Sequence, residues 1–473
     1  MKIIVTPVVS RLTDIKELVP EIVQEIDYEC SFYYKGAEYT NVPMWDGLVH
    51  MFHRKTMSFG TGLLDRIVTV LKKYNIPVEI IKEYPPVTEI DTGQLKISLF
   101  DYQKEALDKI TNHDRGVIKL PTGSGKGCII ATTVAQKRVP TIVLVHRKDL
   151  LYQTQRRFEK EIGITPSLIG DGHSEFGNVT IGMIQTLLSN LGIRTTSFEK
   201  DSTKIKDVKE QLLKYNMVIS DEAHCLGTQL SYKLLKHFKN AMYRYGFSAT
   251  PFHRDEALMI EAAIGPILYE KRPTDLAGQY ISHAKIVFVE FSHRGKISKL
   301  VSYGDLYKQA VVNNTERNLL IKKIAEKFSN RKVLIAVRYV EHGKILNSMI
   351  PGSCFVHGSI SSEERVRVLE SFRKGDIKCV INTVIWEQGI DIPEAEVLID
   401  ARAERSTLGF IQLIGRVLRK TNTKDTALII DIADKQCRWL STHTKERISV
   451  TVSEFGKGFI IKDLVNKIKG GEH

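Results

Sequence analysis

The chain is poor in the residues that cross-link or anchor a protein. Only six of its 473 residues are cysteines, and no two form a C-x-x-C pair, which argues against a zinc ribbon or a redox dithiol. No apolar run reaches the ~18–20 residues that a membrane span needs. The first residues, MKIIVTPVVSRLTD, have no small-residue cleavage site and fit a strand better than a signal peptide. We therefore predict a cytoplasmic protein with reduced cysteines and no membrane contact.

The charge balance is basic. Lys and Arg together number 68, Asp and Glu 55, and the net charge is +13. An excess of this size indicates a polyanionic partner such as nucleic acid, although it also serves solubility. Hydrophobic residues at 42% and charged residues at 26% exclude wholesale disorder. Because a single core stops growing near ~250–300 residues, we expect two or three domains.

Short runs rich in Val and Ile alternate with helical stretches, a pattern that predicts α/β domains with parallel sheets. The first series is GVIKL, TIVLVH, VTIGM, MVIS and YGFS, and the second is KVLIAV, CFVHG, KCVINT, EVLID and ALIIDI. A smaller block with strand, helix and hairpin signals precedes them and ends at Pro85 and Pro86. We predict a small α+β N-terminal domain at residues 1–86 and two tandem parallel-sheet domains at residues 87–280 and 281–473.

A glycine-rich turn joins the run GVIKL to an apolar helical stretch. Such a turn between strand and helix lets backbone N–H groups converge on phosphate oxygens. A lysine at its end reaches the β- and γ-phosphates as a compact cation. The alternative is a chance glycine loop, which the strand and helix on either side make improbable. The predicted phosphate-binding residues are Pro121, Thr122, Gly123, Ser124, Gly125 and Lys126.

One position departs from the usual phosphate-loop pattern. The residue after the lysine normally supplies a hydroxyl to Mg²⁺, but here it is Gly127. Because Mg²⁺ commonly keeps several waters, a water can replace that hydroxyl at some cost in metal affinity. This predicts that Gly127→Thr leaves turnover similar or lowers the Mg²⁺ requirement. The alternative is a weak or inactive ATPase.

Two adjacent carboxylates follow the run MVIS. Asp221 and Glu222 come at the carboxyl end of a predicted strand, where an open α/β sheet binds its ligand. We predict that Asp221 holds Mg²⁺ and that Glu222 orients and polarises the attacking water. His224 fits a coupling role better than a metal-binding role, because no second histidine stands at zinc spacing. As isolated residues, Asp and Glu usually form a solvated surface pair, but this position favours function.

In their order along the chain, these residues resemble superfamily 2 helicases of the DExH type, from about Leu99 to Asp431. The resemblance implies two RecA-like domains that use ATP and Mg²⁺. By this resemblance Phe100 and Gln103 read the adenine, and the amide of Gln103 can both donate to and accept from its edge. The segment SATPFHR resembles the motif that couples hydrolysis to movement, with Ser248, Ala249, Thr250 and Arg254.

The second predicted domain matches the same family. Gly389 and Asp391, in INTVIWEQGIDIP, fall in its fifth motif and are implied to contact the nucleotide. Gln412, Arg416 and Arg419 fall in the sixth motif. By the family pattern Arg419 is the arginine finger, and Arg416 lies beside it on the γ-phosphate. Such a finger stabilises charge on the transferring phosphoryl group. The two domains are expected to complete the site on closure.

A groove across the two domains is expected to hold one nucleic-acid strand. Threonines, amides and basic side chains there give sequence-independent contacts to phosphates, which weaken with salt. ATP binding and hydrolysis would alternate the grip of the two domains and step the protein along the strand. The candidate contacts are Arg147, Lys148, Gln185, Thr186, Arg338 and Thr383.

The segment from Trp45 to Leu64 resembles the N-terminal module of phage UvsW-like branch-migration helicases. Those proteins remodel forks, Holliday junctions and displacement loops. The core motifs are also similar to excision-repair helicases and to the translocating subunits of restriction enzymes. Aromatic and basic residues alternate in this block, which indicates either a duplex-binding or stacking surface or the core of a small domain.

We therefore predict an ATP-dependent DNA helicase or translocase that acts on branched DNA in recombination, repair or replication restart. The resemblance implies 3′-to-5′ movement, DNA as partner in single-stranded, forked or junction form, and a monomer in the cytoplasm, the host's if the protein is viral. An RNA helicase stays open, because the cleft motifs barely separate the two substrates. A DNA-binding protein with a weakened ATP site also stays open, because of Gly127.

Overall fold

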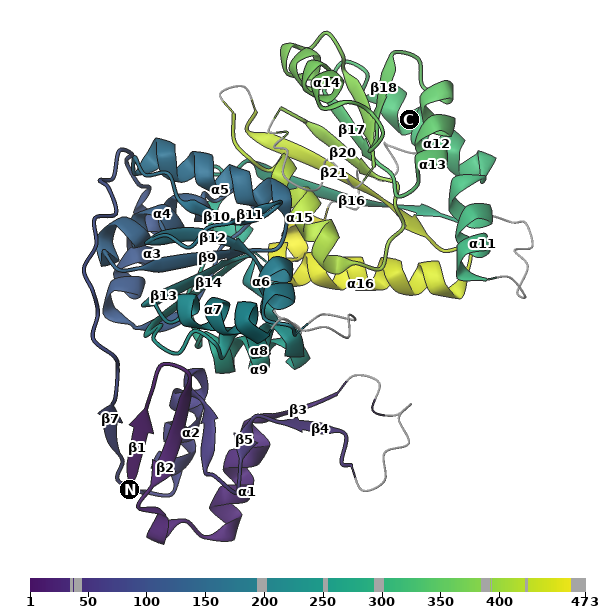
Figure 1. Ribbon diagram of the computed structural model, residues 1–473. Helices are drawn as coiled ribbons and strands as arrows, with labels where there is room; N and C mark the ends of the chain where they lie inside the picture. Colours follow the sequence, from purple (N-terminus) through teal and green to yellow (C-terminus); the bar gives the residue numbers. More distant parts are fainter. Residues whose placement is uncertain are drawn as a thin grey trace. The chain divides into compact units, whose positions relative to one another are not determined.

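The computed structural model describes residues 1–34, 37, 45–193, 202–249, 254–292, 302–383, 392, 394–421 and 424–460. Contacts divide the chain into two units (Figure 1). The first unit is Met1–Leu120 with Gly125–Glu270, and the second is Pro121–Ser124 with Lys271–His473. The division after Glu270 lies close to the predicted boundary at residue 280. Within the described ranges, no helix is both long and apolar enough to cross a membrane.

The N-terminal block is a five-stranded mixed sheet with two helices (Figure 1). Pro20 occupies the first position of α1, where its missing N–H costs no helical hydrogen bond. The strand order is β5-β6-β2-β1-β7, and only the β1–β7 pair is parallel. The elements are β1 (Lys2–Val5), β2 (Val9–Thr13), α1 (Pro20–Glu29), β5 (Phe52–His53), β6 (Ser58–Gly60), α2 (Leu64–Lys73) and β7 (Glu79–Lys82), with single 3-10 turns at Ile15–Glu17 and Thr61–Leu63.

The core of this block extends into the first parallel-sheet region. Leu258 and Met259 of helix α9 (Arg254–Ala263) are buried in the same apolar cluster as residues of α1 and α2. Arg66 of α2 also forms a bidentate ion pair with Glu261 of α9, at 2.7 and 2.8 Å. The block and the first parallel sheet therefore form one unit by contacts, and a separate domain at residues 1–86 stays a prediction.

The predicted hairpin after Cys30 is present. Strand β3 (Ser31–Tyr33) pairs with β4 (Leu48–His50) in antiparallel register. Gly36, the glycine between these two strands, lies outside the described residues. Buried Asp27 of α1 accepts two hydrogen bonds from Arg54, at 2.6 and 2.8 Å, close to the base of this hairpin.

The first unit continues with an eight-stranded sheet of order β11-β10-β12-β9-β13-β14-β8-β15, parallel except for the short β11. Each of the five predicted runs forms a strand of it. The strands are β8 (Arg115–Lys119), β9 (Thr141–Val145), β10 (Ser167–Gly170), β11 (His173–Ser174), β12 (Val179–Met183), β13 (Met217–Asp221), β14 (Tyr243–Ser248) and β15 (Ile267–Glu270). The helices are α3 (Asp101–Asn112), α4 (Lys126–Lys137), α5 (Lys148–Glu161), α6 (Ile184–Asn190), α7 (Ser202–Leu212), α8 (Gln229–Leu235) and α9, with a 3-10 turn at Ala223–Leu226.

The second unit is built on a six-stranded, all-parallel sheet of order β16-β21-β20-β17-β19-β18. Its strands are β16 (His283–Phe291), β17 (Val333–Ala336), β18 (Ser353–Val356), β19 (Cys379–Asn382), β20 (Val397–Asp400) and β21 (Thr426–Asp434). Its helices are α10 (Pro273–Leu276), α11 (Tyr303–Tyr307), a π turn at Lys308–Val312, α12 (Thr315–Lys327), α13 (Val340–Met349), α14 (Ser362–Lys374), α15 (Thr407–Val417) and α16 (Arg438–Phe455), and a 3-10 turn follows at Lys457–Phe459.

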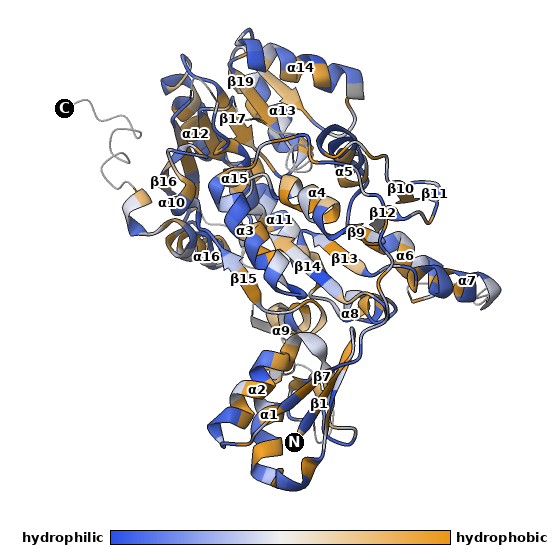
Figure 2. Cartoon of the chain, turned by 90° about the vertical axis from the view of Figure 1, so that its left-hand side faces the viewer, coloured by the Kyte–Doolittle hydropathy of each residue, from blue (hydrophilic) through white to orange (hydrophobic). Residues whose placement is uncertain are grey.

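Burial on both faces explains why these strands are continuous apolar runs. All four residues of β17 are at most 1% exposed, and Figure 2 shows β17 and β19 in hydrophobic colours. Parallel sheets are covered on both sides by their crossover helices, so their strands do not alternate. The same topology brings the carboxyl ends of all parallel strands of a sheet to one edge, and this edge carries the candidate site.

Candidate ATP and nucleic-acid site

The predicted phosphate loop joins β8 to α4. Gly123 and Gly125 have φ angles of +88° and +74°, in the left-handed region that favours glycine. Helix α4 begins at Lys126, so its first N–H groups lie next to the loop. Lys126 is 8% exposed, and its Nζ donates to the carbonyl of Leu120 at 3.3 Å. A helix N-terminus with a buried ammonium beside it is suited to bind phosphates.

The predicted adenine-reading residues lie at the start of α3. Phe100 is 55% exposed, and its ring stacks on Tyr102 with a centroid separation of 6.0 Å. Gln103 is buried, and its Oε1 accepts a hydrogen bond from the Phe100 amide at 2.9 Å. A Cβ built on Gly125 would lie 2.7 Å from Nε2 of Gln103. The glutamine therefore packs directly against the phosphate loop, and glycine at 125 leaves room for it.

Arg157 provides the physical reason for the unusual Gly127. A Cβ built on Gly127 would lie 2.6 Å from Nε and 2.8 Å from Cζ of Arg157. This arginine comes from α5 and donates from one nitrogen to Sγ of Cys128 and Oε1 of Glu161, both at 3.2 Å. The guanidinium thus fills the space that a serine or threonine side chain would take.

The structure changes the expectation that Gly127→Thr alone lowers the Mg²⁺ requirement, because a threonine there must displace Arg157 before it can serve Mg²⁺. We expect Gly127→Thr alone to lower the melting temperature modestly, because Arg157 must swing away and give up its contacts with Cys128 and Glu161. We expect Gly127→Thr combined with Arg157→Ala to regain stability and to need less Mg²⁺ for half-maximal ATP turnover than the wild type. Thermal unfolding and Mg²⁺ titrations of both variants and of Arg157→Ala check this. A stable Gly127→Thr single variant with a lower Mg²⁺ requirement would contradict it.

The two predicted carboxylates lie at the carboxyl end of β13. Asp221 accepts a hydrogen bond from the Glu222 amide at 3.0 Å. Glu222 has φ +57°, a left-handed conformation that is uncommon outside glycine and clusters at functional sites. Burial and then the Glu222 carboxylate raise the pKa of Asp221, while the Lys126 ammonium opposes them. Burial opposes ionisation of Glu222, but His224 and Lys126 outweigh it and lower the pKa of Glu222 to about 2.

The predicted coupling residues connect to this carboxylate. His224 Nδ1 lies 3.3 Å from Oε2 of Glu222 and 3.3 Å from Oγ of Ser248, which is fully buried at the end of β14. Burial lowers the pKa of His224, but hydrogen bonds with Cys225 and Glu222 raise it to about 10. A cationic His224 at neutral pH therefore bridges Glu222 to the SATPFHR segment. Ala249 follows Ser248 and is 4% exposed.

The thiol of Cys225 lies beside the His224 imidazole. Burial alone would raise the pKa of Cys225, but hydrogen bonds with His146 and His224 lower it to about 7. The rings of His146 and His224 have centroids 6.4 Å apart.

Sequence reasoning missed Cys225, His146 and Arg157. The signal for His146 is its position directly after strand β9, at the sheet edge that carries the site, whereas Arg157 lies inside a helix and carries no comparable signal.

Several predicted residues cannot be placed on this structure. Thr250, Gly389 and Asp391 lie outside the described residues, as does the side chain of Arg254. The sixth-motif residues are described. Gln412 and Arg416 lie one turn apart on α15, and Arg419 follows the end of that helix. All three side chains are partly exposed in the second unit.

The nucleic-acid candidates of the first unit follow two adjacent strands. Arg147 and Lys148 come after β9, and Gln185 and Thr186 come after β12, which pairs with β9 in parallel. They therefore share a sheet edge with Asp221. Lys148 is exposed but forms an ion pair with Asp171 at 2.8 Å. In the described part of the chain, the buried Oε1 of Gln185 has no hydrogen-bond partner, which leaves an acceptor for a ligand.

The two candidates of the second unit also follow adjacent parallel strands, β17 and β19. Arg338 lies over the rings of Tyr307 and Tyr339, with its Cζ 5.4 Å from each centroid. Thr383 is 6% exposed, and its hydroxyl has no hydrogen-bond partner among the described residues. Both therefore lie at the carboxyl edge of the second sheet.

The residues at the first sheet edge fit a nucleotide with a divalent cation. Loop amides and Lys126 suit the phosphates, and Asp221 is the oxygen ligand that Mg²⁺ prefers. Among the described residues, no three His, Cys, Asp or Glu side chains cluster to hold a metal.

Two family matches cover the parallel-sheet regions. Residues 96–253 match the family described as Type III restriction enzyme, res subunit. Residues 315–421 match the helicase conserved C-terminal domain. These matches confirm the predicted class of protein, a superfamily 2 helicase that depends on ATP.

Relatives agree with this class. The DNA 3'-5' translocase XPB2 of Sulfurisphaera tokodaii is 26% identical over 412 residues, which cover 77% of this chain and 88% of the relative. The ATP-dependent DNA helicase uvsW of Enterobacteria phage T4 is 24% identical over 435 residues, 82% of each chain, and confirms the predicted resemblance. The structure of the DNA-bound Type ISP restriction-modification enzyme LlaBIII has a TM-score of 0.54 at 14% identity, covering 76% of this chain and 30% of that one. At this identity the likeness concerns the fold, and it agrees with tandem RecA-like domains.

Proposed function

We propose that this superfamily 2 helicase uses ATP hydrolysis to move 3′ to 5′ along DNA and to remodel branched DNA such as forks, Holliday junctions and displacement loops. Both relatives are named as DNA enzymes, one as a 3'-5' translocase. The N-terminal block, which resembles the module of branch-migration helicases, supports the branched substrate. The net charge of +13 supports a polyanionic partner. A monomer and a cytoplasmic location stay predictions.

The observation that carries the proposal is the convergence at the carboxyl edge of the first sheet. Lys126 follows β8, Asp221 and Glu222 end β13, and Ser248 ends β14. These three strands are consecutive neighbours in the sheet. The Lys126 ammonium acts to lower the pKa of both carboxylates, which supports a shared site. This arrangement provides a cation, Lys126, to bind phosphate, one carboxylate, Asp221, to bind the metal, and a second, Glu222, to orient water.

Each residue has a defined part in the proposed reaction. Lys126 and the loop amides bind the phosphates, and Asp221 holds Mg²⁺, which neutralises charge on the phosphate oxygens. Glu222, ionised at neutral pH, orients the attacking water and accepts its proton. Arg416 and Arg419 are proposed to stabilise the transferring phosphoryl group, assisted by Gln412.

We propose that the His224–Ser248 contact couples ATP hydrolysis to movement of the protein on DNA. The two side chains lie 3.3 Å apart, so a change in charge at Glu222 is transmitted to the segment after β14. Arg147, Lys148, Gln185 and Thr186 in the first domain and Arg338 and Thr383 in the second are proposed to grip the strand. Alternating grip moves the protein along it.

The test is the rate of ATP hydrolysis with different nucleic acids. We would compare no cofactor, single strand, duplex, fork, four-way junction and matched RNA, with Lys126→Ala as the control. The proposal expects branched DNA to stimulate most and Lys126→Ala to abolish the signal. Stronger stimulation by RNA would refute the substrate. No stimulation by any cofactor would point instead to a binding protein with a weakened ATP site.

A further inference from the structure

An aromatic cluster lies at the carboxyl edge of the second sheet, beside the predicted contact Arg338. Trp439, the second residue of α16, is 47% exposed. Its ring centroid lies 5.5 Å from that of Tyr303, which begins α11 and is partly exposed. Tyr303 in turn lies 6.3 Å from the buried Tyr307. We name Tyr303, Trp439 and Tyr339 the aromatic shelf.

Basic groups border this shelf. Arg338 lies over Tyr339 and is 35% exposed at its side chain, 3.8 Å from Glu404. Arg405 and Arg438 are exposed. Two nearby acidic groups are paired, Glu446 with Arg405 at 3.2 Å and Glu404 with Arg338 and Arg402, while Asp305 of α11 is exposed. Aromatic rings beside guanidinium groups are the combination that binds unstacked bases and their phosphates.

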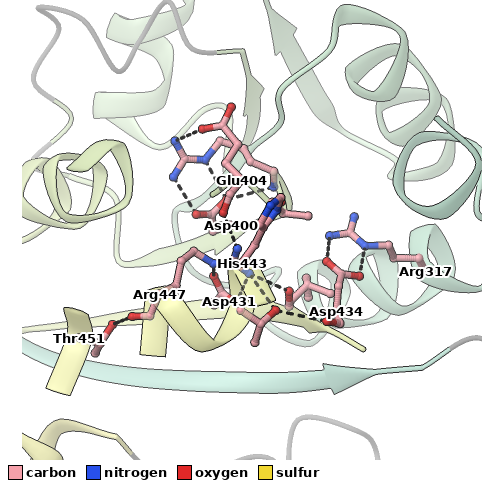
Figure 3. A network of polar contacts seen from close by, with 12 residues as sticks. Arg317, Asp400, Glu404, Asp431, Asp434, His443, Arg447 and Thr451 are labelled. Carbon is pink, nitrogen blue, oxygen red and sulfur yellow. Dashed lines mark hydrogen bonds and ion pairs between the residues drawn. The ribbon is translucent and has the colours of Figure 1, made fainter. Parts of the chain in front are cut away.

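A network of buried ion pairs lies among the elements that carry the shelf (Figure 3). Arg447 of α16 binds Asp431 with two hydrogen bonds of 2.7 and 3.0 Å and donates to the Glu404 carbonyl at 2.6 Å. Arg402 binds Asp400 at 2.7 and 2.8 Å. The Tyr307 hydroxyl donates to the Arg402 carbonyl. These contacts fix α11, α16 and residues 400–405 relative to one another, so the shelf is preorganised for a ligand.

We propose that the aromatic shelf stacks one base of the single DNA strand while Arg338 contacts the adjoining phosphate. The inference rests on the proposed function, because it assigns a site to the same strand. Trp439 packs against the partly exposed Tyr303 with the two ring planes tilted by 47°, and 47% of its surface stays exposed to a ligand. The hydroxyl of Thr383, which has no hydrogen-bond partner among the described residues, directly follows β19, the strand next to β17, and offers a further phosphate contact.

The test compares a normal single strand with one that lacks bases. We would measure the dissociation constant of the full chain for oligothymidylate and for the same backbone with abasic positions. Trp439→Ala is expected to weaken binding of the normal strand about tenfold, from the size of a base–aromatic stack. It should leave the abasic strand unaffected, because only the base is lost. Trp439→Phe is expected to restore most of the affinity, and Val366→Ala, at a valine 52% exposed on α14, serves as the control.

A second measurement follows the stacked base itself. A strand with 2-aminopurine scanned along it should show quenching at one position when wild-type protein binds, and this quenching should vanish with Trp439→Ala. Suppose that DNA stimulates ATP hydrolysis, but Trp439→Ala binds both strands like the wild type and no 2-aminopurine position is quenched. The shelf then stacks no base, and the proposed function stands. If DNA fails to stimulate hydrolysis at all, the proposed function fails whatever the shelf does.

Discussion

Glu222→Gln is expected to lower ATP turnover by about 10²–10⁴ while ATP binding is retained, because a positioned general base contributes that much. Glutamine keeps the size of the side chain but cannot accept the proton of the attacking water. The pKa of Glu222 is about 2, so the wild-type base is ionised across the neutral range. Turnover from steady-state kinetics and affinity from a fluorescent ATP analogue measure the two properties separately.

The control is Glu175→Gln, because Glu175 is exposed in the same unit and away from the predicted site. It is expected to leave both properties unchanged. Lys126→Ala should differ from Glu222→Gln by losing nucleotide affinity as well as turnover. If Glu222→Gln hydrolyses ATP within tenfold of the wild type, another group is the base and the assignment of this side chain is wrong.

Local motifs made the nucleotide side of the site predictable. The turn before Lys126 and the carboxylates Asp221 and Glu222 each follow an apolar run, and a parallel sheet brings such run ends to one edge. No knowledge of distant packing is needed for that inference. The same logic places Arg338 and Thr383 at the edge of the second sheet, after β17 and β19.

Contacts between distant segments were not predictable in the same way. Gly127 looked like a missing hydroxyl, yet its physical reason is the guanidinium of Arg157, 30 residues further along the chain. The N-terminal block is predicted as a domain of its own, and the sequence carries no sign that Leu258 and Met259 of α9 pack in its core. Neither contact has a periodic or compositional signal, because each depends on how a helix packs against its neighbours.

The ion pairs of the second unit are a further case, since charged residues in a sequence usually indicate surface. Arg447 is 1% exposed and its partner Asp431 is 0% exposed. Arg317 and its partner Asp434 are both fully buried. Asp431 and Asp434 lie in β21, a run that otherwise reads as a buried strand. Each arginine binds its carboxylate through two nitrogens, which satisfies charges that burial would otherwise make costly.

Arg447→Met is expected to destabilise the second unit by about 3–5 kcal/mol, because it leaves the Asp431 charge buried without a partner. It also removes the hydrogen bond to the Glu404 carbonyl. Urea unfolding in a Trp45→Phe background measures this unit, since the chain has three tryptophans and Trp386 and Trp439 both lie in residues 271–473.

Two further variants separate the charge effect from the loss of packing. Lys445→Met changes an exposed cation of the same helix and should shift the unfolding midpoint little. Arg447→Met with Asp431→Leu removes both charges, so it should be less destabilised than Arg447→Met alone, as expected when the uncompensated charge is the main cost. If the double variant were as unstable as the single one, packing around the Arg447 stem and its carbonyl contact would account for the loss, and the ion pair would contribute little.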